Sequence, residues 1–104
     1  MIFKDKCIKL GLPEPQSYHN QANYVKYLLL QGLTFNTRKA RFVGIHNLHS
    51  LISKLKRKGL PIETRHGAVW CPFTNTTPPQ AVDIISMTPE NLAEYQSKKS
   101  REEN

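Results

Sequence analysis

The sequence predicts an α+β fold that is mainly α: three helices, a β-hairpin, and a C-terminal extension with one more strand and helix. Two observations carry this prediction. Apolar residues recur at helical spacing up to Gly59, and the pattern then changes to the alternation typical of strands. The clearest helical stripe consists of Leu48, Leu51, Ile52 and Leu55. A chain of 104 residues is long enough for one domain with a small core.

The first element is an N-terminal arm over residues 1–16, expected as a short helix or an extended segment. Pro13 and Pro15 end it, because proline interrupts both helices and strands. A first helix is predicted over residues 17–31, with Ser17 or Asn20 as its N-cap. The side chains expected in the core or at its edge are Tyr18, Gln21, Tyr24, Val25, Leu28 and Leu29.

A second, shorter helix is predicted to begin at Thr34 or Asn36, either of which suits an N-cap, and to end at Gly44. Its core-facing residues are expected to be Phe35, Ala40 and Val43, which leaves Arg38, Lys39 and Arg41 on the outside. A tight turn at Gly44 and Ile45 leads into the third helix.

The third helix, over residues 47–58, is the most clearly predicted element. Opposite its apolar stripe lie His46, Ser50, Ser53 and Arg57, flanked by His49 and Lys54. This face contains no Asp or Glu, although a merely solvated face usually mixes both charges. The sequence therefore indicates a surface that faces an anion.

Residues 62–71 are predicted to form a β-hairpin, with strands at 61–65 and 68–71 and a two-residue turn at His66 and Gly67. Trp70 is expected to pack in the core under this hairpin. A domain over residues 17–72 would then be followed by an extension, 73–104. That extension contains a loop at 73–80, a strand at 81–87, a short helix capped by Thr88, and a frayed charged tail from Lys98.

The net charge of the chain lies entirely between Arg38 and Arg65. This stretch has eight basic residues and one acid, Glu63, for a charge of 8 − 1 = +7, while seven basic and seven acidic residues cancel elsewhere. The basic residues are Arg38, Lys39, Arg41, Lys54, Lys56, Arg57, Lys58 and Arg65. A concentrated positive charge most often faces a nucleic acid backbone.

Three helices, a sharp turn before the third and a hairpin after it make a winged helix-turn-helix. Residues 33–64 resemble the short winged-helix domains common in bacteriophages and bacterial mobile elements. The residues that carry the resemblance are Leu33, Thr34, Ala40, Gly44, Ile45, the run Leu55, Lys56, Arg57, Lys58 and Gly59, and Ile62. The resemblance ends after Cys71 and implies DNA binding, without indicating the biological role.

The predicted mechanism places the third helix in the major groove of DNA, which accepts one helix. The candidates for base contacts are His46, Asn47, His49, Ser50, Ser53 and Arg57. The candidates for backbone and wing contacts are Arg38, Lys39, Arg41, Lys54, Lys58, Arg65 and His66. Neutralising on the order of five to seven phosphates predicts a steep loss of affinity with salt.

Other chemistry has little support in the sequence. The cysteines and histidines lack the paired spacings of a zinc site, and no phosphate loop or nucleophile motif is present. We expect no metal, cofactor, small-molecule ligand or enzymatic activity. The two cysteines and the absence of a long apolar segment predict a cytoplasmic protein. The resemblance to phage domains implies that this is the bacterial host cytoplasm or nucleoid.

The sequence therefore predicts a sequence-specific binder of double-stranded DNA, most simply a small phage or mobile-element transcriptional regulator. The alternatives are a replication or excision accessory factor, or a protein-interaction module with an acidic partner. We expect a homodimer, because one recognition helix makes few base contacts. Residues 81–98 either form the dimer surface or cover the domain's own apolar flank. Deleting residues from Phe73 onward is expected to weaken DNA affinity more than folding.

Overall fold

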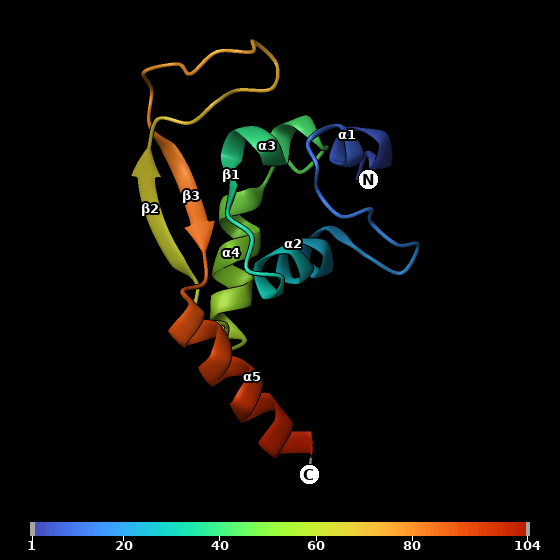
Figure 1. Cartoon of the computed structure of the whole chain (residues 1–104), viewed down its shortest axis with the longest axis vertical. Coiled ribbons are helices and arrows are strands. Elements are labelled where there is room, and N and C mark those ends of the chain that lie inside the picture. The colour runs from blue at the N-terminus through green and yellow to red at the C-terminus, as the bar shows by residue number, and fades with distance from the viewer. Residues whose placement is uncertain (1, 104) are drawn as a thin grey trace.

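A computed structural model describes the backbone of residues 2–103 and the side chains of residues 2–98. The described residues form a small α+β domain with five helices and one three-stranded antiparallel sheet (Figure 1). In chain order the elements are α1 (Lys4–Lys9), α2 (Gln21–Leu30), β1 (Phe35–Asn36), α3 (Thr37–Phe42), α4 (Leu48–Arg57), β2 (Glu63–Gly67), β3 (Val82–Ser86) and α5 (Pro89–Glu103). The predicted α+β class is confirmed.

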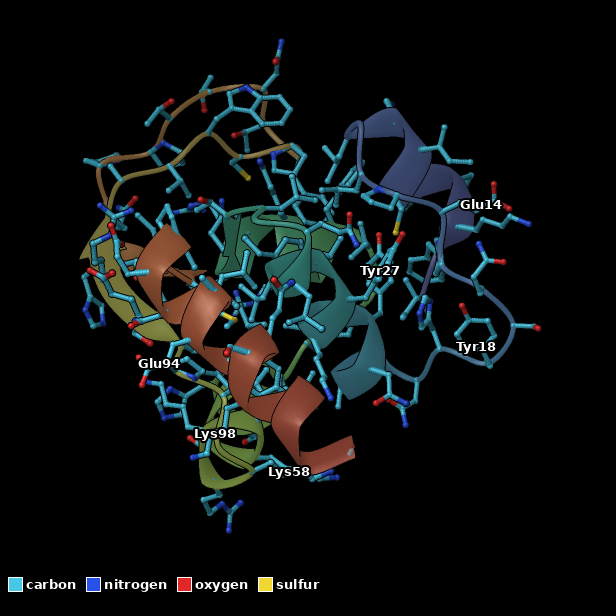
Figure 2. The ribbon with its side chains drawn as sticks, turned by 60° about the horizontal axis from the view of Figure 1, so that its bottom comes forward. Glu14, Tyr18, Tyr27, Lys58, Glu94 and Lys98 are labelled. Carbon is cyan, nitrogen blue, oxygen red and sulfur yellow. The ribbon has the colours of Figure 1, made fainter. Side chains whose placement is uncertain are left out.

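Asparagine side chains set the starts of two helices. The Asn20 side chain accepts a hydrogen bond from the Asn23 backbone N–H at 2.7 Å, so α2 begins at residue 21 rather than 17. Asn36, not Thr34, caps α3 in the same way, through the N–H of Lys39 at 2.9 Å. Tyr18 therefore precedes α2, is 76% exposed and lies on an outer loop (Figure 2), so its predicted place in the core is wrong.

The sheet has the strand order β1-β3-β2, with β3 in the centre. Phe35 of β1 pairs with Ile85 of β3. The β2–β3 ladder runs from the Glu63 and Ser86 pair to the Gly67 and Val82 pair. Segments far apart in the sequence therefore make the whole sheet.

The predicted hairpin over residues 62–71 is wrong in its turn and in its second strand. His66 and Gly67 lie within β2 instead of forming a turn. The predicted strand 68–71 is reduced to a single bridge between Cys71 and Thr76. The strand predicted over residues 81–87 exists, but it is the partner of β2 and not an addition to a finished hairpin.

Burial explains this choice of partner. β3 contributes Ile85, which is 1% exposed, and leads directly into the buried Met87. The 68–71 segment ends at Pro72, which has no N–H to donate to a ladder. Trp70 is 42% exposed and its Nε1 donates to Asn75 Oδ1 at 3.2 Å, so the prediction of a core tryptophan is also wrong.

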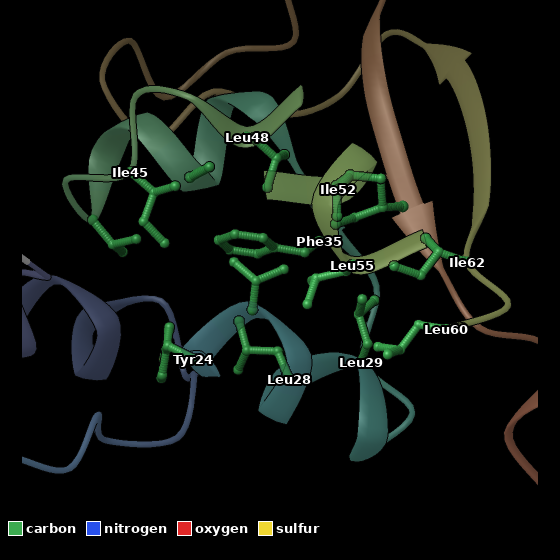
Figure 3. Packing of buried hydrophobic residues seen from close by; sticks show 14 of the residues in the cluster. Tyr24, Leu28, Leu29, Phe35, Ile45, Leu48, Ile52, Leu55, Leu60 and Ile62 are labelled. Atoms are coloured by element: carbon green, nitrogen blue, oxygen red, sulfur yellow. The ribbon is translucent and has the colours of Figure 1, made fainter. Parts of the chain in front are cut away.

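Phe35 lies at the centre of the core, between α2 below it and α4 beside it (Figure 3). Tyr24 is fully buried as predicted, and its hydroxyl donates to the Pro13 carbonyl at 2.6 Å. Burial raises the pKa of Tyr24, because the charged phenolate is disfavoured away from water. The rest of the cluster comes from α1, α2, α3, α4 and β3 and from the segments that follow α3, α4 and β3: Cys7, Val25, Leu28, Leu29, Ala40, Phe42, Val43, Ile45, Leu48, Ile52, Leu55, Leu60, Ile62, Ile85 and Met87.

The C-terminal helix is longer than the sequence predicts. Thr88 caps α5 as expected, since its hydroxyl accepts from the Asn91 N–H at 3.1 Å. Leu92 and Tyr95 pack against the core, whereas Glu94 and Lys98 are exposed (Figure 2). The helix continues to Glu103, so the tail predicted from Lys98 is helical, and the last residue of that tail lies outside the described residues.

Candidate nucleic-acid interface

The local sequence presents α4 as a separate helix with one free face. Gly44, just after α3, and Gly59, just after α4, adopt positive φ angles of 98° and 99°, a conformation that glycine reaches without steric cost. Between α3 and α4, the fully buried Ile45 donates its backbone N–H to the Ala40 carbonyl at 2.8 Å. The buried side of α4 consists of Leu48, Ile52 and Leu55. This geometry holds the opposite side of the helix in solvent.

All six candidates for base contacts are exposed at the start or along the outer side of α4: His46, Asn47, His49, Ser50, Ser53 and Arg57. Lys54 and Lys58 are exposed as well. Asn47 is the N-cap residue of α4 but makes no side-chain capping bond, so its amide is available to a ligand. Within the described side chains, neither Lys54 nor Arg57 forms an ion pair. The sequence prediction of a polar outer face on α4, free of acids, is confirmed.

The tertiary structure adds one acid that the helix pattern does not show. Asp83 of β3 lies between two histidines, with its Oδ1 at 2.7 Å from His66 Nε2 and its Oδ2 at 3.6 Å from His49 Nδ1. The first distance is that of a hydrogen bond and the second is too long for one. The sequence analysis missed Asp83, because its strand was expected outside the hairpin.

A groove of about 140 Å³ separates α4 from the hairpin that β2 and β3 form. It is lined by Leu48, His49, Ile52, Ser53, Lys56, Thr64, His66, Asp83 and Ile85. Lys56 crosses it to donate to Thr64 Oγ1 at 3.1 Å. Lys56 and Thr64 were also absent from the predicted site. Thr64 could have been found only from the alternation of side chains along β2, which places Thr64 and His66 on the same face, toward α4.

The basic residues of α3 do not all face outward. Arg41 is exposed, but Arg38 and Lys39 are half-buried. Arg38 is turned toward the loop 68–81, where its Nη2 donates to the Gln80 carbonyl at 3.4 Å. Its Nε is buried and has no hydrogen-bond partner within the described residues. The predicted outward position is therefore wrong for Arg38, because a loop that was expected elsewhere covers it.

The same guanidinium affects Cys71. Burial disfavours the thiolate of Cys71, but the backbone N–H groups of Thr74 and Phe73, the Thr74 hydroxyl and Arg38 outweigh it and lower the pKa of the thiol. Cys7, in contrast, has a raised pKa because it is buried in the core. Both cysteines are free thiols.

Arg65 and His66, both predicted at the wing tip, lie on opposite faces of the sheet. His66 lines the groove beside α4. Successive residues of a strand alternate, so the exposed Arg65 points to the other face. The tip itself is the loop 68–81, which contains no charged residue. It turns back over α3, where Phe73 packs edge-on against Phe42 at 5.3 Å between ring centroids.

Two further findings concern the described residues only. No group of three His, Cys, Asp or Glu side chains among them is placed to hold a metal ion. None of their helices is both long and apolar enough to cross a membrane. Comparisons of the chain with family models, with curated proteins and with solved structures found no match.

Proposed function

We propose that this chain is a winged helix-turn-helix protein that binds double-stranded DNA, with α4 as the recognition helix. The order of elements supports the proposal: α2, α3 and α4 are followed at once by a two-stranded hairpin. The short β1 between α2 and α3 pairs with β3, which gives the sheet order β1-β3-β2 and keeps β2 and β3 beside α4. The wing of this fold is then β2, the loop 68–81 and β3.

The observation that carries the proposal is the outer face of α4. Ser50, Ser53, Lys54 and Arg57 are exposed there, and no acid lies among them. They belong to the stretch of the chain that holds its whole net charge of +7. A surface of this kind attracts a polyanion, and a single exposed helix has the width that the major groove accepts.

The mechanism divides the side chains by their reach. Near the start of α4, His46, Asn47 and Ser50 face the base edges, and the Asn47 amide is suited to pair with adenine. Further along the helix, Arg57 is suited to guanine, whereas Lys54 and Lys58 neutralise phosphates. Arg41 of α3 and Arg65 of β2 contact the flanking backbone. Arg38 is left out of this set, because it is committed to the loop 68–81.

The biological role that follows is a sequence-specific transcriptional regulator of the small phage or mobile-element type, acting as a homodimer on two half-sites. The dimer surface lies on the exposed side of α5, because β3 is used within the protomer. Ile85 and Met87 are buried in the protomer's own core. Half-sites with inverted symmetry are the expected operator.

The test is binding of the intact chain to a labelled random duplex across a salt series, followed by selection of sequences from a random pool. The matched variants are Arg57→Ala on α4 and Lys9→Ala on α1, since both remove one exposed positive charge and Lys9 lies outside the proposed DNA and dimer surfaces. We expect Arg57→Ala to reduce the slope of log affinity against log salt by about 1 or to relax the selected motif. Lys9→Ala leaves both unchanged.

Each outcome has a distinct meaning. A steep slope with an inverted-repeat motif supports a dimeric regulator. A steep slope without a selected motif contradicts a sequence-specific regulator and supports an accessory role in replication or excision. Equal effects of the two variants, or no binding at low salt, contradict α4 as a DNA-reading helix.

A further inference from the structure

The groove between α4 and the hairpin differs from the outer face of α4 because its polar groups come from three elements. His49, Ser53 and Lys56 come from α4, Thr64 and His66 from β2, and Asp83 from β3. Its floor is apolar and consists of Leu48, Ile52 and Ile85. All the polar groups except Asp83 can donate a hydrogen bond.

Asp83 is oriented toward the two imidazoles. Its side chain is 25% exposed, whereas those of His49 and His66 are 86% and 71% exposed. The carboxylate therefore lies at the inner end of the groove, with both rings toward solvent. His66 uses Nε2 and His49 turns Nδ1 to the carboxylate, and the other nitrogen of each ring has no hydrogen-bond partner among the described residues.

We propose that this groove binds one backbone phosphate of the DNA, with protonated His49 and His66 as donors and Asp83 as the positioning residue. The inference rests on the proposed function, since the DNA brings the phosphate. His66 donates its Nε2–H to Asp83, His49 turns its Nδ1 toward the same carboxylate at 3.6 Å, and the other N–H of each ring donates to a phosphate oxygen. A phosphate oxygen accepts a stronger hydrogen bond from a charged N–H donor than from a neutral one.

Lys56 completes the site. Its Nζ is held at 3.1 Å from Thr64 Oγ1, so a fixed positive charge stands at the same groove. The charged and titratable groups that face the histidines are Lys56 from α4 and Asp83 from β3, while Glu63 and Arg65 of β2 point to the opposite sheet face. Within the described part of the groove, histidine is thus the side-chain type that ordinarily changes charge between pH 5.5 and 8.

This coupling has a measurable consequence. Because the phosphate selects the protonated rings, DNA binding takes up protons and tightens as the pH falls. A linked group whose pKa changes by one unit on binding alters the binding constant by up to about tenfold, and two such groups by up to about a hundredfold, so we expect affinity to rise by roughly tenfold or more between pH 8.0 and 5.5. A role for Asp83 in folding alone predicts no such dependence of DNA affinity.

The experiment measures the affinity of one duplex at constant ionic strength from pH 5.5 to 8.0. The proteins are the intact chain, the double variant His49→Gln with His66→Gln, the variant Asp83→Asn, and His19→Gln as a control outside the groove. We expect the double variant to bind at pH 8.0 and to lose most of the pH dependence, with His46 at the start of α4 as the source of any remainder. Asp83→Asn reduces the dependence, and His19→Gln retains it in full.

A second arm identifies the source of the phosphate. Imidazole NMR signals of the intact chain are followed during titration with the duplex and, separately, with inorganic phosphate at matched ionic strength. We expect the duplex alone to shift the signals of His49 and His66. Saturable shifts with inorganic phosphate would overturn the assignment to the DNA backbone.

The failures are distinguishable. If no duplex binds at any pH, the proposed function itself is wrong. If the duplex binds with the same affinity at every pH, or the double variant keeps the full pH dependence, DNA binding stands and the phosphate site in this groove is wrong.

Discussion

α4 and the segment over residues 61–87 that follows it differ in where their partners lie. Every hydrogen bond that forms α4 joins residues within a few positions of each other, and its apolar stripe is visible in the sequence. In the hairpin segment, Gly67 pairs with Val82 across a long loop. The local pattern was sufficient for α4, whereas competition between the adjacent segment 68–71 and the distant β3 decided the partner of β2.

Removal of β3, the distant partner of β2, is expected to have the largest effect. From the sequence, deletion of residues 73–104 is expected to weaken DNA binding more than folding. From the structure, we expect the deletion to weaken folding first, and DNA binding as a consequence. The deletion removes β3, the central strand, and with it the buried Ile85 and Met87. We expect loss of cooperative thermal unfolding by circular dichroism. Truncation after Lys98, which keeps β3, serves as the control and retains the transition.

A single side chain of β3, Ile85, tests how much this strand contributes to stability. Ile85 is 1% exposed, whereas the neighbouring Ile84 is half-buried on the other sheet face. We expect Ile85→Ala to lower the free energy of unfolding by about 3 kcal/mol, from lost burial and the cavity left behind. Ile84→Ala is expected to cost less than half of that. Chemical denaturation measures both, and equal costs would contradict the register of β3.

The loop between the two strands is the next target. Replacing residues 68–81 with Asn-Gly joins Gly67 to Val82 through a turn that suits a two-residue hairpin. The shorter loop closes at a gain of about 1.7 kcal/mol, while the edge-on packing of Phe73 on Phe42 is lost at a cost of about 1 kcal/mol. We therefore expect the fold to persist with a small change in the unfolding midpoint. A variant that fails to fold would show that the loop contributes to the core.

The smallest expected effect is a difference in reactivity between the two thiols. Cys7 lies in the core, and Cys71 lies in the loop 68–81. The pKa of Cys71 is lowered and that of Cys7 is raised by burial. At pH 7 a larger fraction of Cys71 is thiolate, and we expect the loop around it to open more readily than the core that holds Cys7. We expect iodoacetamide to label Cys71 roughly tenfold faster than Cys7, as measured by mass spectrometry of peptides. Labelling of Cys7 first would contradict the positions of both residues.

The predicted site was recovered unevenly for the same reason. The base-contact candidates on α4 could be found because helical spacing alone separates its outer face from its core side. Arg38 and Trp70 were misplaced because their surroundings are made by the loop 68–81, whose path no local pattern indicates. Asp83 could not be found, since its position beside His49 depends on the pairing of β3 with β2.

The apolar stripe of α4, the cap at Thr88 and the concentration of charge followed from the sequence alone, because they depend on neighbours within one or two turns. For α2 and α3 the sequence left two N-cap candidates each, and the structure selects Asn20 and Asn36. Only the tertiary structure decided the partner of β2 and the acid that stands between His49 and His66. Pairing β2 with a distant strand closes a long loop, which costs conformational entropy. Burial of apolar surface must offset this cost, and β3 supplies it by bringing Ile85 into the core.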